Sequence, residues 1–314
     1  MKNSVLLVDS VHNIIPERLA KYGFKVDSGM DWSRDEIISK LSDYCGIVIR
    51  SRINIDKEFI DAGINLKFIA RVGAGMESID IKYCKLKNIT CLNSPEGNRD
   101  AVGEHAIGMI LSLFNKLNKA DREVKSGNWN REENRGLELK GKIVGIIGYG
   151  NMGSSFAKKL SGFDCKVISY DKYKHDYSDA FTEAVRLEDI FSRADILSLH
   201  VPLTEETKYL VNQTFISRFN KPFYLINTAR GPVVETQALV EALKSGKILG
   251  AGLDVIEYEE TSFETTKSML ENEDFKYLST CENVLMTPHI AGWTNESKIK
   301  LAEVLANKII ALKL

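Results

Sequence analysis

The most specific chemical signal in this chain of 314 residues is a glycine-rich turn from Gly148 to Gly153, with the sequence GYGNMG. It follows an apolar run, Lys142–Ile147, and opens a helical stretch, Ser154–Leu160. In that context the first glycine permits a tight turn, the second lets the backbone approach a pyrophosphate, and the third lets the helix pack on the strand. The helix N-terminus offers free N–H groups and a positive dipole end to phosphates. The pattern predicts a dinucleotide site.

A carboxylate follows this turn at the distance that a ribose diol requires. Asp171 ends the next predicted strand, Lys166–Asp171. Such a carboxylate accepts hydrogen bonds from the ribose and repels a 2′-phosphate, which favours NAD over NADP. Lys172 and Lys174 lie close enough in sequence to soften that discrimination.

Three further groups fit the needs of a nicotinamide enzyme that acts on a hydroxy or keto group. Such an enzyme needs a cation for the substrate, an acid/base near neutrality and a carboxylate that orients and charge-stabilises this base. His289 and Arg230 each follow a predicted strand, at the edge where α/β sheets bind ligands. A guanidinium binds a carboxylate through two hydrogen bonds. The candidate carboxylates follow a third strand and are Glu257, Glu259 and Glu260.

The elements that must position these groups alternate between short apolar runs and amphipathic stretches, which predicts an α/β fold with parallel sheets. In the first part, strands are expected at Ser4–Asp9, Phe24–Asp27, Gly46–Arg50, Leu66–Val72 and Ile89–Asn93, and helices at Pro16–Tyr22, Ser33–Ser42, Asp56–Ala62 and Ile81–Lys87. A turn cluster at Asn93–Gly97 indicates a domain edge.

The second part begins with one long predicted helix, Arg99–Lys125. Its strands are apolar nearly end to end, as in a parallel sheet that is buried on both faces. They are expected at Lys142–Gly148, Lys166–Asp171, Asp195–Val201, Phe223–Thr228, Gly250–Val255 and Asn283–Thr287. A last helix, Asn295–Leu312, is expected to return to the first domain and so give that domain two pieces.

Composition excludes several classes of protein. The formal net charge is −1, so the basic excess of a nucleic-acid binder is lacking. The sequence has no run of 18 apolar residues, so we expect no membrane partner. Its five cysteines include no CxxC pair, which indicates free thiols in a reducing compartment and no metal site. These features predict a cytoplasmic globular protein.

Together the motifs resemble those of the D-isomer-specific 2-hydroxyacid dehydrogenases, over nearly the whole chain. The motifs are Gly148–Gly153, Leu199–Thr204 (LHVPLT), Asn227–Gly231 (NTARG), Gly252–Val255 (GLDV) and Thr287–Gly292 (TPHIAG). The resemblance implies an NAD-binding Rossmann domain, residues 97–288, inserted into a smaller flavodoxin-like α/β substrate domain, residues 1–96 and 289–314. It also implies NAD as the cofactor, a cleft between the domains and a homodimer.

The resemblance also assigns roles. Arg230 binds the substrate, His289 is the acid/base and a glutamate partners His289. The family places this glutamate five residues after Asp254, which gives Glu259; the proline that normally follows is Glu260 here, so Glu257 and Glu260 stay as alternatives. The implied cofactor-binding residues are Gly148, Gly150, Asn151, Met152, Gly153, Asp171, His200, Val201, Pro202, Thr228, Ala229 and Asp254. His12, His105 and His175 match no catalytic position.

Within the family, the chain is most similar to the 3-phosphoglycerate dehydrogenase branch. There, arginines at the positions of Arg50 and Arg71 meet the substrate phosphate. The other implied substrate-binding residues are Ser51, Gly73, Ala74 and Gly75. The resemblance predicts oxidation of D-3-phosphoglycerate to 3-phosphohydroxypyruvate, the first step of serine biosynthesis, without a regulatory serine-sensing domain. The alternatives are a glyoxylate/hydroxypyruvate or general D-2-hydroxyacid dehydrogenase and an NAD-sensing, corepressor-like binding protein.

Overall fold

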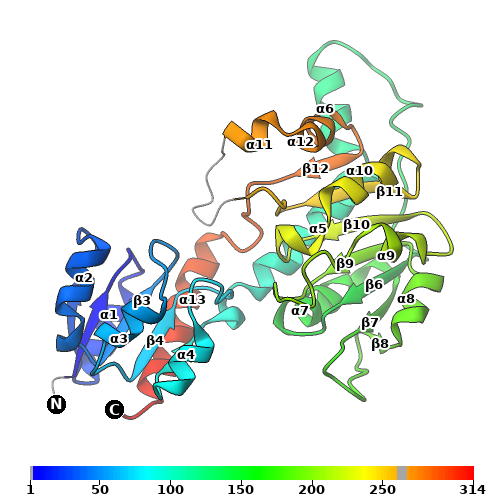
Figure 1. The fold of residues 1–314 in the computed structure, drawn as a ribbon. Coiled ribbons are helices and arrows are strands. Elements are labelled where there is room, and N and C mark those ends of the chain that lie inside the picture. The colour runs from blue at the N-terminus through cyan, green and yellow to red at the C-terminus, as the bar shows by residue number, and fades with distance from the viewer. Residues whose placement is uncertain (1–2, 260–266) are drawn as a thin grey trace. The chain divides into compact units, whose positions relative to one another are not determined.

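The computed structural model (Figure 1) describes residues 3–259 and 267–314, except the side chains of residues 267 and 268. The chain divides into two compact units, the first formed by residues 1–98 and 293–314 and the second by residues 99–292. The boundaries therefore fall after residues 98 and 292, whereas the sequence placed them after residues 96 and 288. The first boundary is later because Gly97 packs on the last helix: a Cβ atom there would lie 2.5 Å from the Leu301 nitrogen.

The first unit is a parallel five-stranded sheet of order β2-β1-β3-β4-β5, which is the flavodoxin-like order. Its strands are β1 (Ser4–Leu7), β2 (Lys25–Ser28), β3 (Gly46–Ile49), β4 (Phe68–Arg71) and β5 (Thr90–Leu92). Its helices are α1 (Ile14–Lys21), α2 (Arg34–Lys40), α3 (Lys57–Ala62), α4 (Ile81–Leu86) and α13 (Asn295–Ile310), with short 3-10 turns at η1 (Leu41–Asp43) and η2 (Pro95–Gly97).

The side chains along and just after β1 alternate between the two faces of the sheet, which explains why helices cover both faces. Val5 and Leu7 join a core with α1 and α13, whereas Leu6 and Val8 join a second core with α2, α3 and α4. Successive side chains of a strand point to opposite faces, so an uninterrupted apolar strand needs helices on each side.

The second unit is a parallel seven-stranded sheet of order β12-β11-β10-β9-β6-β7-β8, the Rossmann order with one further strand. Its strands are β6 (Ile143–Ile147), β7 (Lys166–Tyr170), β8 (Glu183–Ala184), β9 (Ile196–Leu199), β10 (Phe223–Asn227), β11 (Ile248–Leu253) and β12 (Val284–Met286). Its helices are α5 (Arg99–Phe114), α6 (Leu117–Lys125), α7 (Asn151–Leu160), α8 (Leu187–Arg193), α9 (Gln213–Ser217), α10 (Thr236–Lys244), α11 (Lys267–Glu271) and α12 (Glu273–Thr280), with 3-10 turns at η3 (Ser161–Phe163) and η4 (Gly231–Val233).

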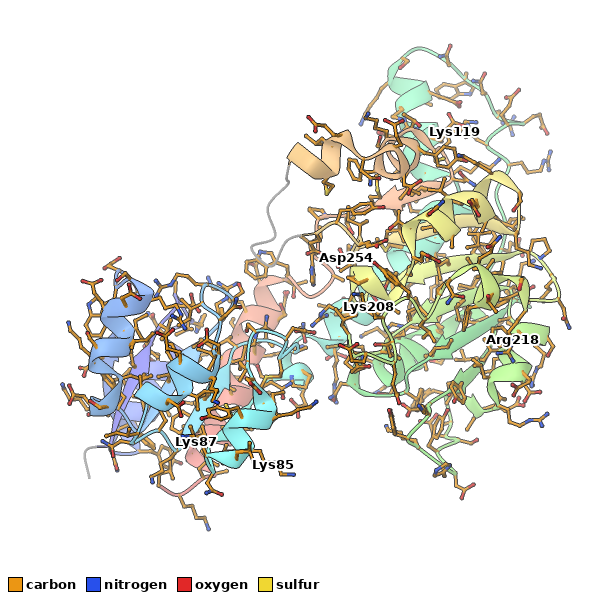
Figure 2. The ribbon with its side chains drawn as sticks, viewed as in Figure 1. Lys85, Lys87, Lys119, Lys208, Arg218 and Asp254 are labelled. Atoms are coloured by element: carbon orange, nitrogen blue, oxygen red, sulfur yellow. The ribbon has the colours of Figure 1, made fainter. Side chains whose placement is uncertain are left out.

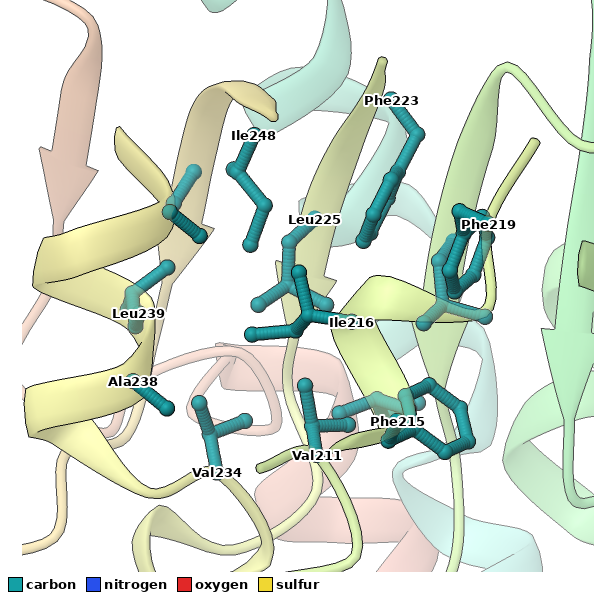
Figure 3. Packing of buried hydrophobic residues seen from close by; sticks show 14 of the residues in the cluster. Val211, Phe215, Ile216, Phe219, Phe223, Leu225, Val234, Ala238, Leu239 and Ile248 are labelled. Atoms are coloured by element: carbon teal, nitrogen blue, oxygen red, sulfur yellow. The ribbon is translucent and has the colours of Figure 1, made fainter. Parts of the chain in front are cut away.

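A large apolar cluster lies between this sheet and the helices α8, α9 and α10 (Figure 3). Phe219 stacks on Phe223 with ring centroids 3.7 Å apart, and both side chains are almost fully buried. This packing fixes β10 and β11, the strands from which two of the candidate catalytic groups extend.

The predicted α/β fold is confirmed, with two differences in its elements. The single helix expected over Arg99–Lys125 is two helices, because the backbone turns at Lys116, whose φ is 49°. A left-handed residue interrupts the helical hydrogen-bond ladder. The short edge strand β8 was not predicted, since two residues carry no periodic signal. Among the described helices, none combines the length and apolarity that crossing a membrane requires.

Candidate active site

The glycine turn has the geometry that a pyrophosphate needs. Gly148 has a φ of 91°, and a Cβ atom there would lie 2.5 Å from the His200 carbonyl oxygen and 2.9 Å from a Val201 methyl carbon. A Cβ atom on Gly153 would lie 2.1 Å from the Gly148 carbonyl oxygen, whereas one on Gly150 would meet nothing within 4 Å. Gly150 also starts α7 without a side-chain cap, so the first-turn N–H groups, including those of Asn151 and Met152, face an open site. These residues fit a dinucleotide phosphate.

The candidate ribose carboxylate, Asp171, is held in place by the backbone. Asp171 accepts hydrogen bonds from the Tyr149 nitrogen at 2.8 Å and the Tyr173 nitrogen at 3.0 Å. A carboxylate has about four lone-pair sites, so acceptor capacity remains for a ribose diol. The buried Thr228 hydroxyl, next to the turn after β10, has no hydrogen-bond partner within the described residues, so it can serve a bound cofactor.

His200 is a buried histidine that carries no charge near neutral pH. Its ring is buried, its Nε2 lies 2.8 Å from the Ser198 hydroxyl, and it packs on Phe156 with ring centroids 5.2 Å apart. Burial lowers the pKa of His200 to about 3. It is therefore unsuited to exchange protons with a substrate near neutrality.

This buried histidine predicts a stability difference at acid pH. Below pH 6.5, the ordinary pKa of a histidine side chain, the unfolded His200 binds a proton, whereas the folded protein does not bind it until about pH 3. Stability therefore falls as the pH is lowered through this window, with a slope of about 1.4 kcal/mol per pH unit from this residue. We expect urea unfolding of His200→Gln between about pH 5.5 and pH 4 to lack that contribution. Equal slopes in the two proteins would contradict a neutral buried imidazole.

Asp254, labelled in Figure 2, follows β11 and shapes the loop that carries His289. Its side chain is 1% exposed. The Asp254 carbonyl accepts the His289 N–H at 2.8 Å. Its carboxylate accepts the N–H groups of Ile290 and Ala291, each at 2.8 Å, and the Thr287 hydroxyl at 2.6 Å. His289 has a φ of 54°, a left-handed conformation that is rare outside glycine and costs free energy. The bonds to Asp254 stabilise it.

The motif around Asp254 predicts a cofactor contact and does not indicate this structural role. His105, which matches no catalytic position, also lies here: its Nε2 is 3.1 Å from the Thr287 hydroxyl and 3.5 Å from an Asp254 oxygen. No local signal points to either contact, because α5 lies far from β12 in the chain.

Of the two candidate glutamates that the structure describes, Glu259 lies next to His289. Oε1 of Glu259 lies 2.5 Å from Nδ1 of His289. Glu257 is engaged elsewhere, because it accepts the Tyr209 hydroxyl at 2.6 Å and the Thr236 nitrogen at 2.9 Å. Glu260 lies outside the described residues.

Arg230 reaches the same sheet edge from β10. Asn227 holds its turn by donating to the Arg230 carbonyl at 3.0 Å and accepting the Ala229 N–H at 3.0 Å. A Cβ atom on Gly231 would lie 1.8 Å from the Ile256 carbonyl oxygen, so the turn packs directly on the segment that leads to Glu259. β10, β11 and β12 are neighbours, so Arg230, Glu259 and His289 follow the carboxyl ends of three adjacent strands.

The candidate substrate residues of the first unit also share one sheet edge. Arg50 follows β3; its N–H donates to Asp9 and its guanidinium lies 4.8 Å from the Trp293 ring centroid. Arg71 ends β4 and donates to the carbonyls of Arg50, at 3.0 Å, and Gly75, at 2.6 Å. Its guanidinium therefore also shapes the loop Gly73–Gly75, while Ser51 is half-buried in the bend after Arg50. Among the described residues, no cluster of His, Cys, Asp and Glu is arranged to hold a metal ion.

Comparisons with known proteins agree with this geometry. Residues 107–291 match the family model "D-isomer specific 2-hydroxyacid dehydrogenase, NAD binding domain". The chain is 33% identical to D-3-phosphoglycerate dehydrogenase of Archaeoglobus fulgidus, over 98% of this chain but only 56% of that protein. It is 38% identical to glyoxylate reductase of Thermofilum pendens, over 91% of this chain and 84% of that protein.

A solved structure gives the same result. The D-lactate dehydrogenase of Aquifex aeolicus, complexed with NAD and lactic acid, is 30% identical and superposes with a TM-score of 0.81, covering 99% of this chain and 95% of that chain. The second unit is thus an NAD-binding Rossmann domain. The chain belongs to the D-isomer-specific 2-hydroxyacid dehydrogenases, a family of NAD-dependent oxidoreductases.

Proposed function

We propose that this protein oxidises D-3-phosphoglycerate to 3-phosphohydroxypyruvate with NAD, as the first step of serine biosynthesis. The observation that carries the reaction class is the pair of Glu259 and His289, which lies at the edge of the sheet that receives Arg230 from the neighbouring strand. The 33% identical relative from Archaeoglobus fulgidus, named D-3-phosphoglycerate dehydrogenase, supports the substrate.

The contacts of His289 indicate which of its nitrogens reacts. Because Nδ1 faces a carboxylate oxygen of Glu259 at 2.5 Å, Nδ1 carries the hydrogen and Nε2 is the nitrogen that can accept a proton. Nε2 takes the substrate's hydroxyl proton while the C2 hydrogen leaves as hydride and the C–O bond becomes a carbonyl. Bound NAD supplies the hydride acceptor. Glu259 stabilises the resulting imidazolium, and Arg230 binds the substrate carboxylate.

The proposed phosphate site rests on Arg50 and Arg71. Arg50 follows β3 and Arg71 ends the adjacent strand β4, and the guanidinium of Arg50 lies over the ring of Trp293. Two guanidinium groups provide more positive charge than a plain 2-keto acid requires, and they suit the additional negative charge of a phosphate. A second candidate is reduction of glyoxylate or hydroxypyruvate; it is favoured by the hydrogen bonds that Arg71 already makes to two carbonyls, and by the 38% identical glyoxylate reductase.

Steady-state assays of Arg50→Ala and Arg71→Ala distinguish these candidates. Hydrogen bonds to charged groups are worth about 1.5–3 kcal/mol, so we expect kcat/KM for D-3-phosphoglycerate to fall by roughly 10- to 150-fold. Because glyoxylate and hydroxypyruvate lack the phosphate, kcat/KM for these two substrates should change by less than about threefold. Arg50→Ala is the cleaner variant, because the main-chain bonds of its position remain. Equal losses on all three substrates would assign both arginines to the loop and favour the second candidate.

We further propose that the protein works as a cytoplasmic homodimer. Three apolar side chains of α6 and the segment after it are strongly exposed: Leu117 at 54%, Val124 at 48% and Trp129 at 76%. Surface of this kind commonly marks a protein interface, and a second copy is the partner that the family resemblance implies. The five free cysteines fit a reducing compartment.

A further inference from the structure

A second carboxylate, that of Glu206, contacts the two residues that follow Asp171, the candidate ribose carboxylate. Glu206, in the loop after β9, places one oxygen 2.8 Å from the Lys172 ammonium and the other 2.5 Å from the Tyr173 hydroxyl. Lys172 and Tyr173 directly follow Asp171 in the chain. Glu206 therefore acts on the residues that surround the ribose carboxylate.

The loop that presents Glu206 is itself well anchored. The Thr207 hydroxyl donates to the Pro202 carbonyl at 2.6 Å and accepts the Thr204 N–H at 2.8 Å. These bonds close a tight turn over residues 202–207, which contains Glu206. The Glu206 carboxylate therefore has a defined position although it is exposed.

Both lysines near Asp171 are turned to other partners. Lys174 donates to the Tyr149 carbonyl, at 2.5 Å, and Lys172 pairs with Glu206. The pairing raises the pKa of Lys172 and lowers that of Glu206, so both groups are charged at neutral pH. A third carboxylate, Asp179, accepts the Tyr149 hydroxyl at 2.7 Å. A 2′-phosphate would thus meet more negative charge than positive charge here.

We propose that Glu206 is a positioning residue for cofactor selectivity: it withdraws the Lys172 ammonium from the ribose 2′ position, adds negative charge there and so disfavours NADP. Ribose recognition by Asp171 does not depend on it, because the Asp171 carboxylate is oriented by the N–H groups of Tyr149 and Tyr173. Discrimination against the 2′-phosphate is therefore shared between two carboxylates, of which one contacts the ribose and the other controls a lysine.

The test measures the binding of NADH and of NADPH to the Glu206→Gln protein. Binding is monitored through the fluorescence of the reduced nicotinamide at low salt. This readout needs no hydroxy-acid substrate, so it is independent of the proposed reaction. The glutamine keeps an oxygen for the Tyr173 hydroxyl but releases Lys172. We expect the Kd for NADPH to fall by at least about threefold and the Kd for NADH to change by less than about twofold. The gain should shrink at high salt.

Two further variants separate this role from a general charge effect. Glu205→Gln removes the same charge from the neighbouring exposed position and should leave NADPH binding within about twofold of the wild type. The double variant Lys172→Ala/Glu206→Gln should lose the gain, because the released ammonium is absent. Unchanged NADPH binding in Glu206→Gln, an equal gain in Glu205→Gln, or a gain that survives in the double variant would each overturn the proposal.

Discussion

Replacing His289 with alanine is expected to lower kcat by at least about 10²-fold, because general acid–base catalysis contributes about 10²- to 10⁴-fold. The variant lacks Nε2, the nitrogen that we propose receives the substrate's hydroxyl proton, while the glycine turn and Asp171 are untouched. Binding of NADH should therefore remain within about twofold of the wild-type value.

The measurement pairs NADH production with NADH binding in the same preparation. His12→Ala is the matched control, since the His12 ring lies in the other unit, where its Nδ1 accepts a weak hydrogen bond from the Ile14 nitrogen, at 3.3 Å. It should retain full turnover. Turnover of His289→Ala near that of the control would remove His289 from the mechanism.

The second large effect is expected at Arg230. Two charge-assisted hydrogen bonds to the substrate carboxylate are worth about 3–6 kcal/mol together, so Arg230→Ala should lower kcat/KM by at least about 10²-fold. Arg230→Lys keeps the charge but loses the planar fork, so it should fall between the alanine variant and the wild type. Most of the loss should be seen in KM if the carboxylate is bound equally in ground and transition states.

Binding of NADH and the free energy of unfolding are the controls for Arg230. Asn227 holds the turn at Arg230 through main-chain groups, which both substitutions preserve, whereas the alanine variant also loses a bond from the guanidinium to the Ala229 carbonyl, at 2.6 Å. Neither control should therefore change much. An Arg230→Lys enzyme with wild-type kcat/KM would show that a point charge suffices, and an active Arg230→Ala enzyme would exclude substrate binding by this residue.

Asp254 illustrates a kind of residue that motif reasoning assigns incompletely. The motif around it indicated a cofactor-site residue, whereas its carboxylate is engaged by three groups of the loop around His289. The left-handed backbone of His289 depends on these bonds. Neither fact follows from a motif, because the loop lies more than thirty residues away in the chain.

The sequence by itself determined the parallel α/β fold and the glycine turn, and it indicated the strands from which Arg230 and His289 extend. These features depend on short-range rules: apolar periodicity, a glycine at positive φ and the crossover of β-α-β units. Tertiary structure decided that Glu257 turns to Tyr209 while Glu259 approaches His289, where the helix after residue 99 breaks, and that Lys172 turns to Glu206. In each case the local sequence is compatible with more than one outcome. Contacts between segments that are distant in the chain determine which outcome occurs.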